Sequence, residues 1–201
     1  MSRIGVFGGT FNPIHNGHIQ MIEACRNFAG LDKVIVIPSY TPPHKQCDML
    51  ADETQRLEMC KIACRNLEFA EISDIEIKRG GTSYTFETLQ SLKQIYPDDE
   101  LCFIMGADMF LSLENWKNPE RIFELATIIA VPRNSDDKYD LLKHYTDVLK
   151  KMGANAEILN DSVLTVSSTF IRDNILHIER IKDLIDDKVY EYIINNKLYR
   201  V

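Results

Sequence analysis

An apolar run followed by a glycine pair and two closely spaced histidines is the feature that most constrains this chain. The run Ile4–Phe7 is typical of a buried strand, and the segment Gly8–His18 reads Gly-Gly-Thr-Phe-Asn-Pro-Ile-His-Asn-Gly-His. Glycines let the backbone turn tightly and approach a ligand, because they carry no Cβ. His15 and His18 fall where a helical pattern begins, and the N–H groups at a helix N-terminus bind anions. We therefore predict a phosphate-handling site here.

The composition is typical of a cytoplasmic protein. The 201 residues suffice for one well-buried α/β domain and are few for two. A formal net charge of −7 argues against a protein that wraps nucleic acid, because such proteins usually carry a basic face. No secretory signal is recognisable, and no run approaches the ~20 apolar residues needed to span a bilayer. We therefore predict no nucleic-acid partner and no membrane association.

The five cysteines are an odd number at scattered positions, so no disulfide framework is expected. Cys60 and Cys64 lie four residues apart on a predicted helix, a spacing that would suit half of a metal site. No Cys-x-x-Cys pair or nearby histidine pair completes a ligand set. We predict reduced thiols in the core and no metal held by protein ligands.

Short apolar runs alternate with helical patterns along the chain. The expected strands are Arg3–Phe7, Lys33–Ile37, Glu71–Ile77, Leu101–Met105, Thr127–Val131 and Ala156–Leu159. Asn118-Pro119-Glu120 predicts a capped helix that ends at Leu125. Alternation of apolar strands with helices predicts an α/β fold, in which a doubly wound, mostly parallel sheet is covered by helices on both faces.

Glycine-containing and polar segments follow four of the expected strands directly. They are Gly8–His18, Pro38–Lys45, Gly106–Asp108 and Pro132-Arg133. In parallel sheets, ligands bind in the crevice beyond the carboxyl ends of the strands, so these segments should share one site. The stretch Ser39–Leu50 fits both a substrate flap and a plain surface connection.

The two histidines can act as hydrogen-bond donors to a phosphate or as proton-transfer groups. The glycines of Gly5–Gly9 miss the G-x-G-x-x-G spacing of dinucleotide-binding folds, and no Walker A lysine and hydroxyl pair is present. Hydride transfer and P-loop phosphoryl transfer are therefore weakly supported.

Other polar residues of the predicted crevice each allow two interpretations. Ser167, Ser168 and Thr169 are either a plain helix cap or, together with Arg172, a second anion cradle. Trp116 is either a core residue or a stacking platform within a polar stretch.

Three charged residues that follow expected strands also allow two interpretations each. Asp108 either caps a helix or contacts a ribose or magnesium-bound water. Lys45 and Arg133 are either solvated surface cations or anion contacts.

The segment Gly8–His18 resembles the H-x-G-H motif of a nucleotidyltransferase superfamily. More closely, the chain is similar to the bacterial nicotinate mononucleotide adenylyltransferases. Four further stretches match that family in order: Pro42-Pro43-His44-Lys45, Ser83-Tyr84-Thr85, Gly106-Ala107-Asp108 with Trp116 downstream, and Ser167–Arg172. Tyr192-Ile193 and Leu198-Tyr199 also fit, so the resemblance covers nearly the full length.

The resemblance implies a Rossmann-like nucleotidyltransferase domain over residues 1–201, with a C-terminal helical part from about 167 to 201 packed on it. It implies transfer of the adenylyl group of ATP to nicotinate mononucleotide, with Mg²⁺ bound to the ATP. The partners would be these two small molecules, and a homo-oligomer stays open.

The resemblance also implies a role for each matching residue. His15, His18 and Arg172 would be catalytic. ATP would be bound by these three and by Gly8, Gly9, Thr10, Phe11, Gly106, Asp108, Ser167, Ser168 and Thr169. Nicotinate mononucleotide would be bound by Lys45, Ser83, Tyr84, Thr85, Trp116, Lys117 and Arg133.

One position departs from the family pattern, because Asn12 stands where the family usually has aspartate. The change removes a charge and puts a magnesium-binding role for this position in doubt. Two rivals stay open: a sister transferase acting on phosphopantetheine or a phosphorylated alcohol, and a nucleotide-binding regulator without turnover.

Overall fold

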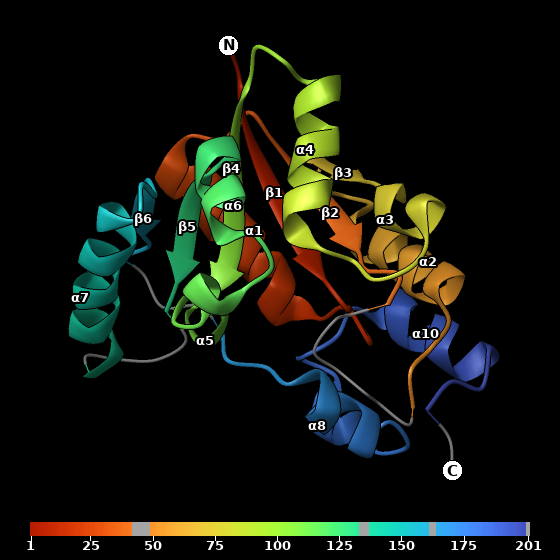
Figure 1. Ribbon diagram of the computed structural model, residues 1–201. Coiled ribbons are helices and arrows are strands. Elements are labelled where there is room, and N and C mark those ends of the chain that lie inside the picture. Colours follow the sequence, from red (N-terminus) through yellow and green to blue (C-terminus); the bar gives the residue numbers. More distant parts are fainter. Residues whose placement is uncertain (42–48, 133–136, 161–163, 200–201) are drawn as a thin grey trace.

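A six-stranded sheet forms the centre of the protein in a computed structural model that describes residues 1–41, 49–132, 137–160 and 164–199 (Figure 1). The strands are β1 Arg3–Gly9, β2 Lys33–Pro38, β3 Ala70–Ile72, β4 Glu100–Gly106, β5 Thr127–Val131 and β6 Ala156–Ile158. All neighbouring strands are parallel, in the order β3-β2-β1-β4-β5-β6. The chain winds outward from β1 in one direction and from β4 in the other. The predicted doubly wound sheet is confirmed, and its crevice lies where β1 and β4 end.

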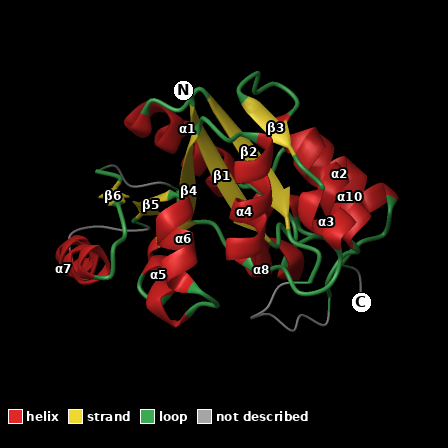
Figure 2. Cartoon of the chain, turned by 45° about the horizontal axis from the view of Figure 1, so that its top comes forward, coloured by secondary structure: helices red, strands yellow, loops and turns green. Residues whose placement is uncertain are grey.

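Helices cover both faces of this sheet. One layer contains α1 Asn16–Ala29, α2 Glu53–Cys64, α8 Ser168–Asp173, α9 Ile178–Ile181 and α10 Asp187–Asn195. The other contains α3 Ile75–Arg79, α4 Thr85–Ile95, α5 Ala107–Phe110, the 3₁₀ turn η1 Leu113–Asn115, α6 Pro119–Leu125 and α7 Asp137–Lys151. Figures 1 and 2 show α4 and α6 crossing in front of the sheet, with α1 behind it.

Two hydrophobic clusters, one on each face, hold the layers together. Successive side chains of a strand point to opposite faces, so Ile4 and Val6 join one cluster and Phe7 joins the other. The C-terminal helices share the cluster of Phe7, to which they contribute buried residues including Ile181 and Val189. The C-terminal part is therefore continuous with the core of the sheet.

The expected strand over Glu71–Ile77 is wrong beyond Ile72. The structure has the short strand β3 and then the helix α3, which begins at Ile75. Pairing with β2 ends where the Ser73 amide donates to the Val36 carbonyl at 3.0 Å. The stretch was predicted as a strand among the short apolar runs of the chain, but the residue buried in α3 is the charged Glu76.

The helix expected after Asn118 has its predicted ends, but its predicted cap is wrong. Asn118 has a left-handed backbone, with φ of 52°, and its side chain makes no capping hydrogen bond. Pro119 occupies the first turn as expected, because its missing N–H has no partner to lose there.

The predicted core position of Cys60 and Cys64 is confirmed, since both thiols are unbridged and buried. Burial raises the pKa of Cys64 to about 12, so this thiol stays protonated at neutral pH. Among the helices that the structure describes, none is both long enough and apolar enough to cross a membrane.

Candidate active site

The two histidines of the glycine-rich segment close the N-terminus of α1. His15 is the N-cap residue, and its Nδ1 accepts a hydrogen bond of 3.3 Å from the His18 amide. In return, Nδ1 of His18 accepts one of 3.2 Å from the His15 amide. The rings stack with their centroids 3.6 Å apart and an interplanar angle of 16°. The predicted location of both imidazoles at a helix start is confirmed, in the form of a reciprocal capping box.

This capping box fixes the tautomer of both rings. A backbone N–H can only donate, so each Nδ1 must be an acceptor and each neutral ring carries its proton on Nε2. Phe11 packs edge-on against His18 with centroids 5.1 Å apart, and only 6% of His15 is exposed. The pair is therefore held rigidly, as donors that stabilise developing negative charge need to be.

We expected the glycine pair to make the turn after β1, and this prediction is wrong. Gly8 and Gly9 continue the strand, and the chain turns at Phe11, whose φ is 49°. A Cβ on Gly9 would lie 2.8 Å from the Phe11 ring, so this glycine is needed for the close approach of that ring. The ring in turn supports His18.

Asn12 connects the loop after β1 to two distant segments. Its Nδ2 donates to the Met49 carbonyl at 3.0 Å. Its Oδ1 accepts from the Ala51 amide at 3.1 Å and from the Tyr199 hydroxyl at 2.7 Å. Only 4% of Asn12 is exposed. A carboxylate could not donate to Met49, so the departure from the family's aspartate has a structural use here.

The C-terminal segment contacts the same loop through two side chains. Arg172 Nη1 donates to the Asn12 carbonyl at 2.8 Å, and Ser168 Oγ donates to the Pro13 carbonyl at 3.0 Å. Ser167 caps α8, as the simpler interpretation predicted, since its Oγ accepts from the Phe170 amide. Thr169 lies beside them, and its Oγ1 accepts from Arg172 Nη2.

Not every donor of Arg172 is used. Its buried Nε has no hydrogen-bond partner in the part of the chain that the structure describes. The Arg172 guanidinium therefore lies against the loop Thr10–His15, here called the histidine loop, with one of its donors unused.

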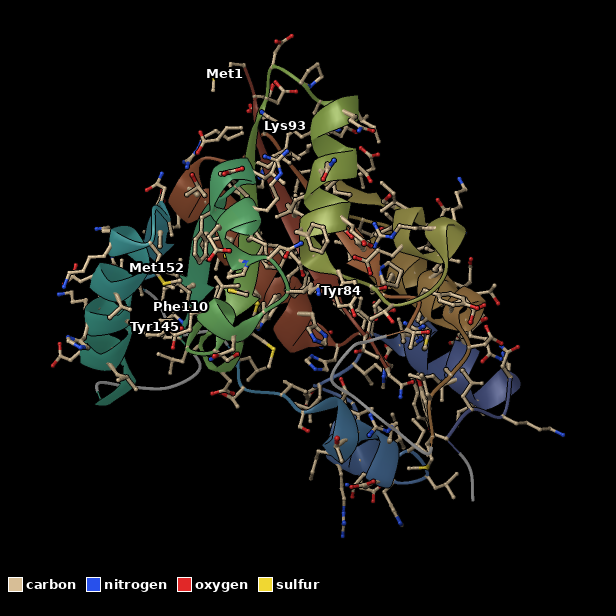
Figure 3. All side chains as sticks on the ribbon, viewed as in Figure 1. Met1, Tyr84, Lys93, Phe110, Tyr145 and Met152 are labelled. Atoms are coloured by element: carbon tan, nitrogen blue, oxygen red, sulfur yellow. The ribbon has the colours of Figure 1, made fainter. Side chains whose placement is uncertain are left out.

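The segment Ser83–Thr85 forms the open N-terminus of α4. Ser83 is buried, and its Oγ accepts from the Tyr40 amide at 3.1 Å. Tyr84 makes no side-chain cap, and the amides of Thr85 and Phe86 donate to no other described residue. Figure 3 shows Tyr84 where α4 begins, at the edge of the sheet where the strands end. This terminus suits a small anion.

Trp116 satisfies parts of both interpretations. Its ring packs edge-on against Phe103 at 6.2 Å and its Nε1 donates to Ser112, yet the residue is only half-buried. Lys117 beside it is exposed. Trp116 thus combines a fixed edge with an accessible surface, as a stacking platform requires.

The segment that follows β4 packs against α7. Gly106 ends the strand, and Asp108 lies exposed in the first turn of α5. Phe110 of the same helix packs edge-on against Tyr145 of α7, with centroids 5.5 Å apart (Figure 3). The other predicted contacts, Lys45 and Arg133, lie outside the described residues.

Glu76 is a buried carboxylate behind Ser83, and we expect it to make stability pH-dependent. It accepts a 2.6 Å hydrogen bond from Thr88, but burial outweighs the hydrogen bonds from Thr88 and Ser83 and raises its pKa. The folded state thus keeps this proton to a higher pH than the unfolded state, so stability falls as the pH rises through that interval. The free energy of unfolding of Glu76→Gln, relative to wild type, should rise in urea titrations as the pH rises above the ordinary pKa of a glutamate, about 4.

The exposed Glu68→Gln variant is the matched control for this titration. Parallel pH profiles for Glu76→Gln and wild type would contradict the prediction.

Two residues of this region were not predicted to contribute to the site. Arg56 of α2 is fully buried and contacts the Thr10 carbonyl, and Tyr199 reaches Asn12 from the end of the chain. Arg56 had a signal, because it precedes Cys60 by four residues and so shares the buried face of its helix. Tyr199 had none in the local pattern.

Comparisons with known proteins agree with this geometry. A family model described as cytidylyltransferase-like matches residues 6–174. A Clostridium tetani (strain Massachusetts / E88) protein, named "Probable nicotinate-nucleotide adenylyltransferase", is 39% identical over 200 residues, with all of both chains covered. A relative of the same name from Clostridium perfringens (strain 13 / Type A) is 38% identical, with 100% of this chain and 99% of the relative covered.

A solved structure shares the fold. Plasmodium falciparum nicotinic acid mononucleotide adenylyltransferase, complexed with NaAD, gives a TM-score of 0.78 at 20% identity, with 99% of this chain and 98% of the other covered. The resemblance stated from the motifs is confirmed by the full-length relatives. The chain therefore belongs to the cytidylyltransferase-like family, and within it to the nicotinate-nucleotide adenylyltransferases.

Proposed function

We propose that this protein transfers the adenylyl group of ATP to nicotinate mononucleotide, forming nicotinate adenine dinucleotide and pyrophosphate in NAD biosynthesis. One observation carries the proposal: the locked His15–His18 pair stands beyond the carboxyl end of β1 in a chain whose full-length relatives are named for this activity. The Nε2 atoms of the paired rings would contact a polyphosphate.

ATP would lie between the histidine loop and the C-terminal segment. The Nε2 donors and the backbone of Gly8–Phe11 would contact its phosphates from one side. The hydroxyls of Ser167–Thr169 and the Arg172 guanidinium would contact them from the other side. Gly106 and Asp108 would lie beside a ribose.

Nicotinate mononucleotide would lie over the start of α4. The amides there, together with the backbone near Lys117, would receive its carboxylate, because the positive end of a helix favours an anion. Trp116 would stack on the nicotinate ring, and Ser83 and Tyr84 would border it. Lys45 and Arg133 would contact phosphate.

The chemistry needs little from a general base. The 5′-phosphate of the mononucleotide is already an anionic nucleophile, so its oxygen attacks the α-phosphorus while the bond to the bridging oxygen of pyrophosphate breaks. The barrier lies in bringing two anions together and in stabilising the transferring group. Positioning and electrostatic stabilisation should therefore supply most of the rate, as in other phosphoryl transfers.

Mg²⁺ would enter with ATP rather than occupy a cage of protein ligands. Among the described residues, no group of three or more histidine, cysteine, aspartate or glutamate side chains could hold a metal ion. A site without a cluster of protein ligands suits Mg²⁺, because this ion keeps several of its waters and binds mainly to substrate phosphates. Asp108 is the carboxylate that would contact it through water, and the ion would neutralise phosphate charge.

A pyrophosphate-release assay tests the proposal. Purified protein is given ATP with nicotinate mononucleotide, nicotinamide mononucleotide or phosphopantetheine, and the product is identified by mass. We expect pyrophosphate with the nicotinate substrate and none with ATP alone. Turnover only with phosphopantetheine would identify a sister transferase, and no turnover with any acceptor would identify a nucleotide-binding regulator.

Replacing Trp116 with alanine should raise the KM for nicotinate mononucleotide about fivefold, because an aromatic stacking contact contributes about 1 kcal/mol. The KM for ATP and kcat should change little. Steady-state kinetics measure both, and Trp116→Phe, which keeps a ring, is the matched control. An unchanged KM for the mononucleotide would confine Trp116 to core packing.

A further inference from the structure

Arg56 is a buried cation that forms no salt bridge with a described residue. It is 1% exposed and lies near the start of α2, where the carboxylates of Asp52 and Glu53 favour its charge without reaching its guanidinium. Burial lowers the pKa of its guanidinium, and the surrounding groups do not offset that effect. An unpaired buried charge is costly, and a well-packed apolar residue would suit stability better. The position thus calls for a reason other than core packing.

Backbone carbonyls from three separate segments receive its hydrogen bonds. Nε donates to Ala51 at 3.0 Å, Nη1 to Thr10 at 2.8 Å and Nη2 to Tyr40 at 3.1 Å. Thr10 belongs to the histidine loop, which is proposed to contact the phosphates of ATP. The amide of Tyr40 donates to Ser83 Oγ at 3.1 Å, at the start of the segment proposed to bind the mononucleotide. One planar group therefore connects the loops of both substrates.

The bond to Thr10 also orients the next amide. In a trans peptide, the carbonyl and the following N–H point in opposite directions, so the Phe11 amide points away from Arg56. That amide donates to no other described residue. A hydrogen bond from a guanidinium to the carbonyl polarises the peptide and strengthens its N–H as a donor. The Phe11 amide is thereby oriented and strengthened as a hydrogen-bond donor, and a phosphate oxygen could accept from it.

We infer that Arg56 is a positioning residue: its guanidinium holds the histidine loop at Thr10 and, through the contact of Tyr40 with Ser83, the mononucleotide segment Ser83–Thr85 in one fixed relation. The inference rests on the proposed function, because the alignment matters only if both substrates bind here. Small displacements of reacting groups lower the rate of a step that depends on proximity and orientation. Loss of the guanidinium fork should therefore act on kcat more than on KM.

Arg56→Lys tests the fork, because lysine keeps the charge but has one nitrogen and cannot donate to three carbonyls in a plane. Arg56→Met removes the charge as well. Met59→Ala is the matched control, since Met59 is fully buried one turn later on the same helix and makes no polar contact with the site. Each variant is assayed at a temperature where circular dichroism shows it folded, with active protein counted by binding of α,β-methylene ATP.

We expect kcat per folded enzyme to fall about tenfold in Arg56→Lys and at least as far in Arg56→Met, with each KM within about threefold of wild type. Met59→Ala should lower Tm while its kcat stays within twofold. The inference is overturned if Arg56→Lys keeps the wild-type kcat, or if Met59→Ala loses kcat equally. If Arg56→Met does not fold, Arg56→Lys decides alone.

The wild-type enzyme separates this inference from the proposed function. Absence of pyrophosphate release by wild type would reject the proposed function itself. Normal wild-type turnover with unaffected Arg56→Lys would reject only the positioning role.

Discussion

Replacing His18 with alanine should lower kcat by at least about 100-fold, the scale on which loss of one preorganised transition-state donor is felt. The stacked His15 ring and the Phe11 ring hold the His18 ring in place, so its Nε2, which is proposed to contact a phosphate, needs no reorganisation as charge develops. Steady-state pyrophosphate release with ATP and nicotinate mononucleotide measures the effect.

The same substitution also removes part of a helix cap, so a second variant must separate the two losses. His18→Asn retains an acceptor oxygen near the position of Nδ1 and can still receive the His15 amide, but it has no counterpart of Nε2. Loss of a helix cap costs about 1 kcal/mol of stability. We expect His18→Asn to recover the stability lost in His18→Ala without recovering kcat. Near-normal turnover in His18→Asn would reject the assigned donor role.

The elements that the sequence predicted well are those whose patterns are local. The four central strands carry no polar side chain after their first residue because helices cover both faces, and their residues identify them without further context. The failure at Glu76 has a physical cause. Its carboxylate is buried because Thr88 and Ser83 of the next segment hydrogen-bond to it, which no pattern within Glu71–Ile77 announces.

In the candidate site too, residues that belong to a local motif were predictable, and contacts between distant segments were not. The His15–His18 spacing places both rings at one helix terminus, so a local motif sufficed to predict their neighbourhood. The contact of Tyr199 with Asn12 spans 187 positions and depends on how the C-terminal segment returns to β1. Nothing in either residue's surroundings in the sequence indicates it. Contacts of this kind follow from the tertiary fold alone.

Replacing Arg172 with alanine should reduce kcat/KM for ATP about 100-fold, which is as large as the loss expected at His18. Arg172 holds the loop through the Asn12 carbonyl, and its guanidinium is proposed to contact the triphosphate as well. A charged hydrogen bond at the reacting phosphates is worth about 2 to 4 kcal/mol in the transition state, so its loss alone accounts for most of the effect. Kinetics with each substrate varied in turn should show a greater loss for ATP than for the mononucleotide.

Two companion variants distinguish phosphate binding from loop anchoring. Arg172→Lys keeps the charge, but a single nitrogen cannot serve both the Asn12 carbonyl and a phosphate, so it should recover only part of the activity. Arg180→Ala removes a nearby exposed arginine that donates to Asn174, and its kinetics should stay within about twofold of wild type because surface contacts of this kind contribute little. If Arg172→Ala loses stability but keeps its kcat/KM for ATP, the guanidinium only anchors the chain, and the triphosphate must be held by the histidines and hydroxyls without it.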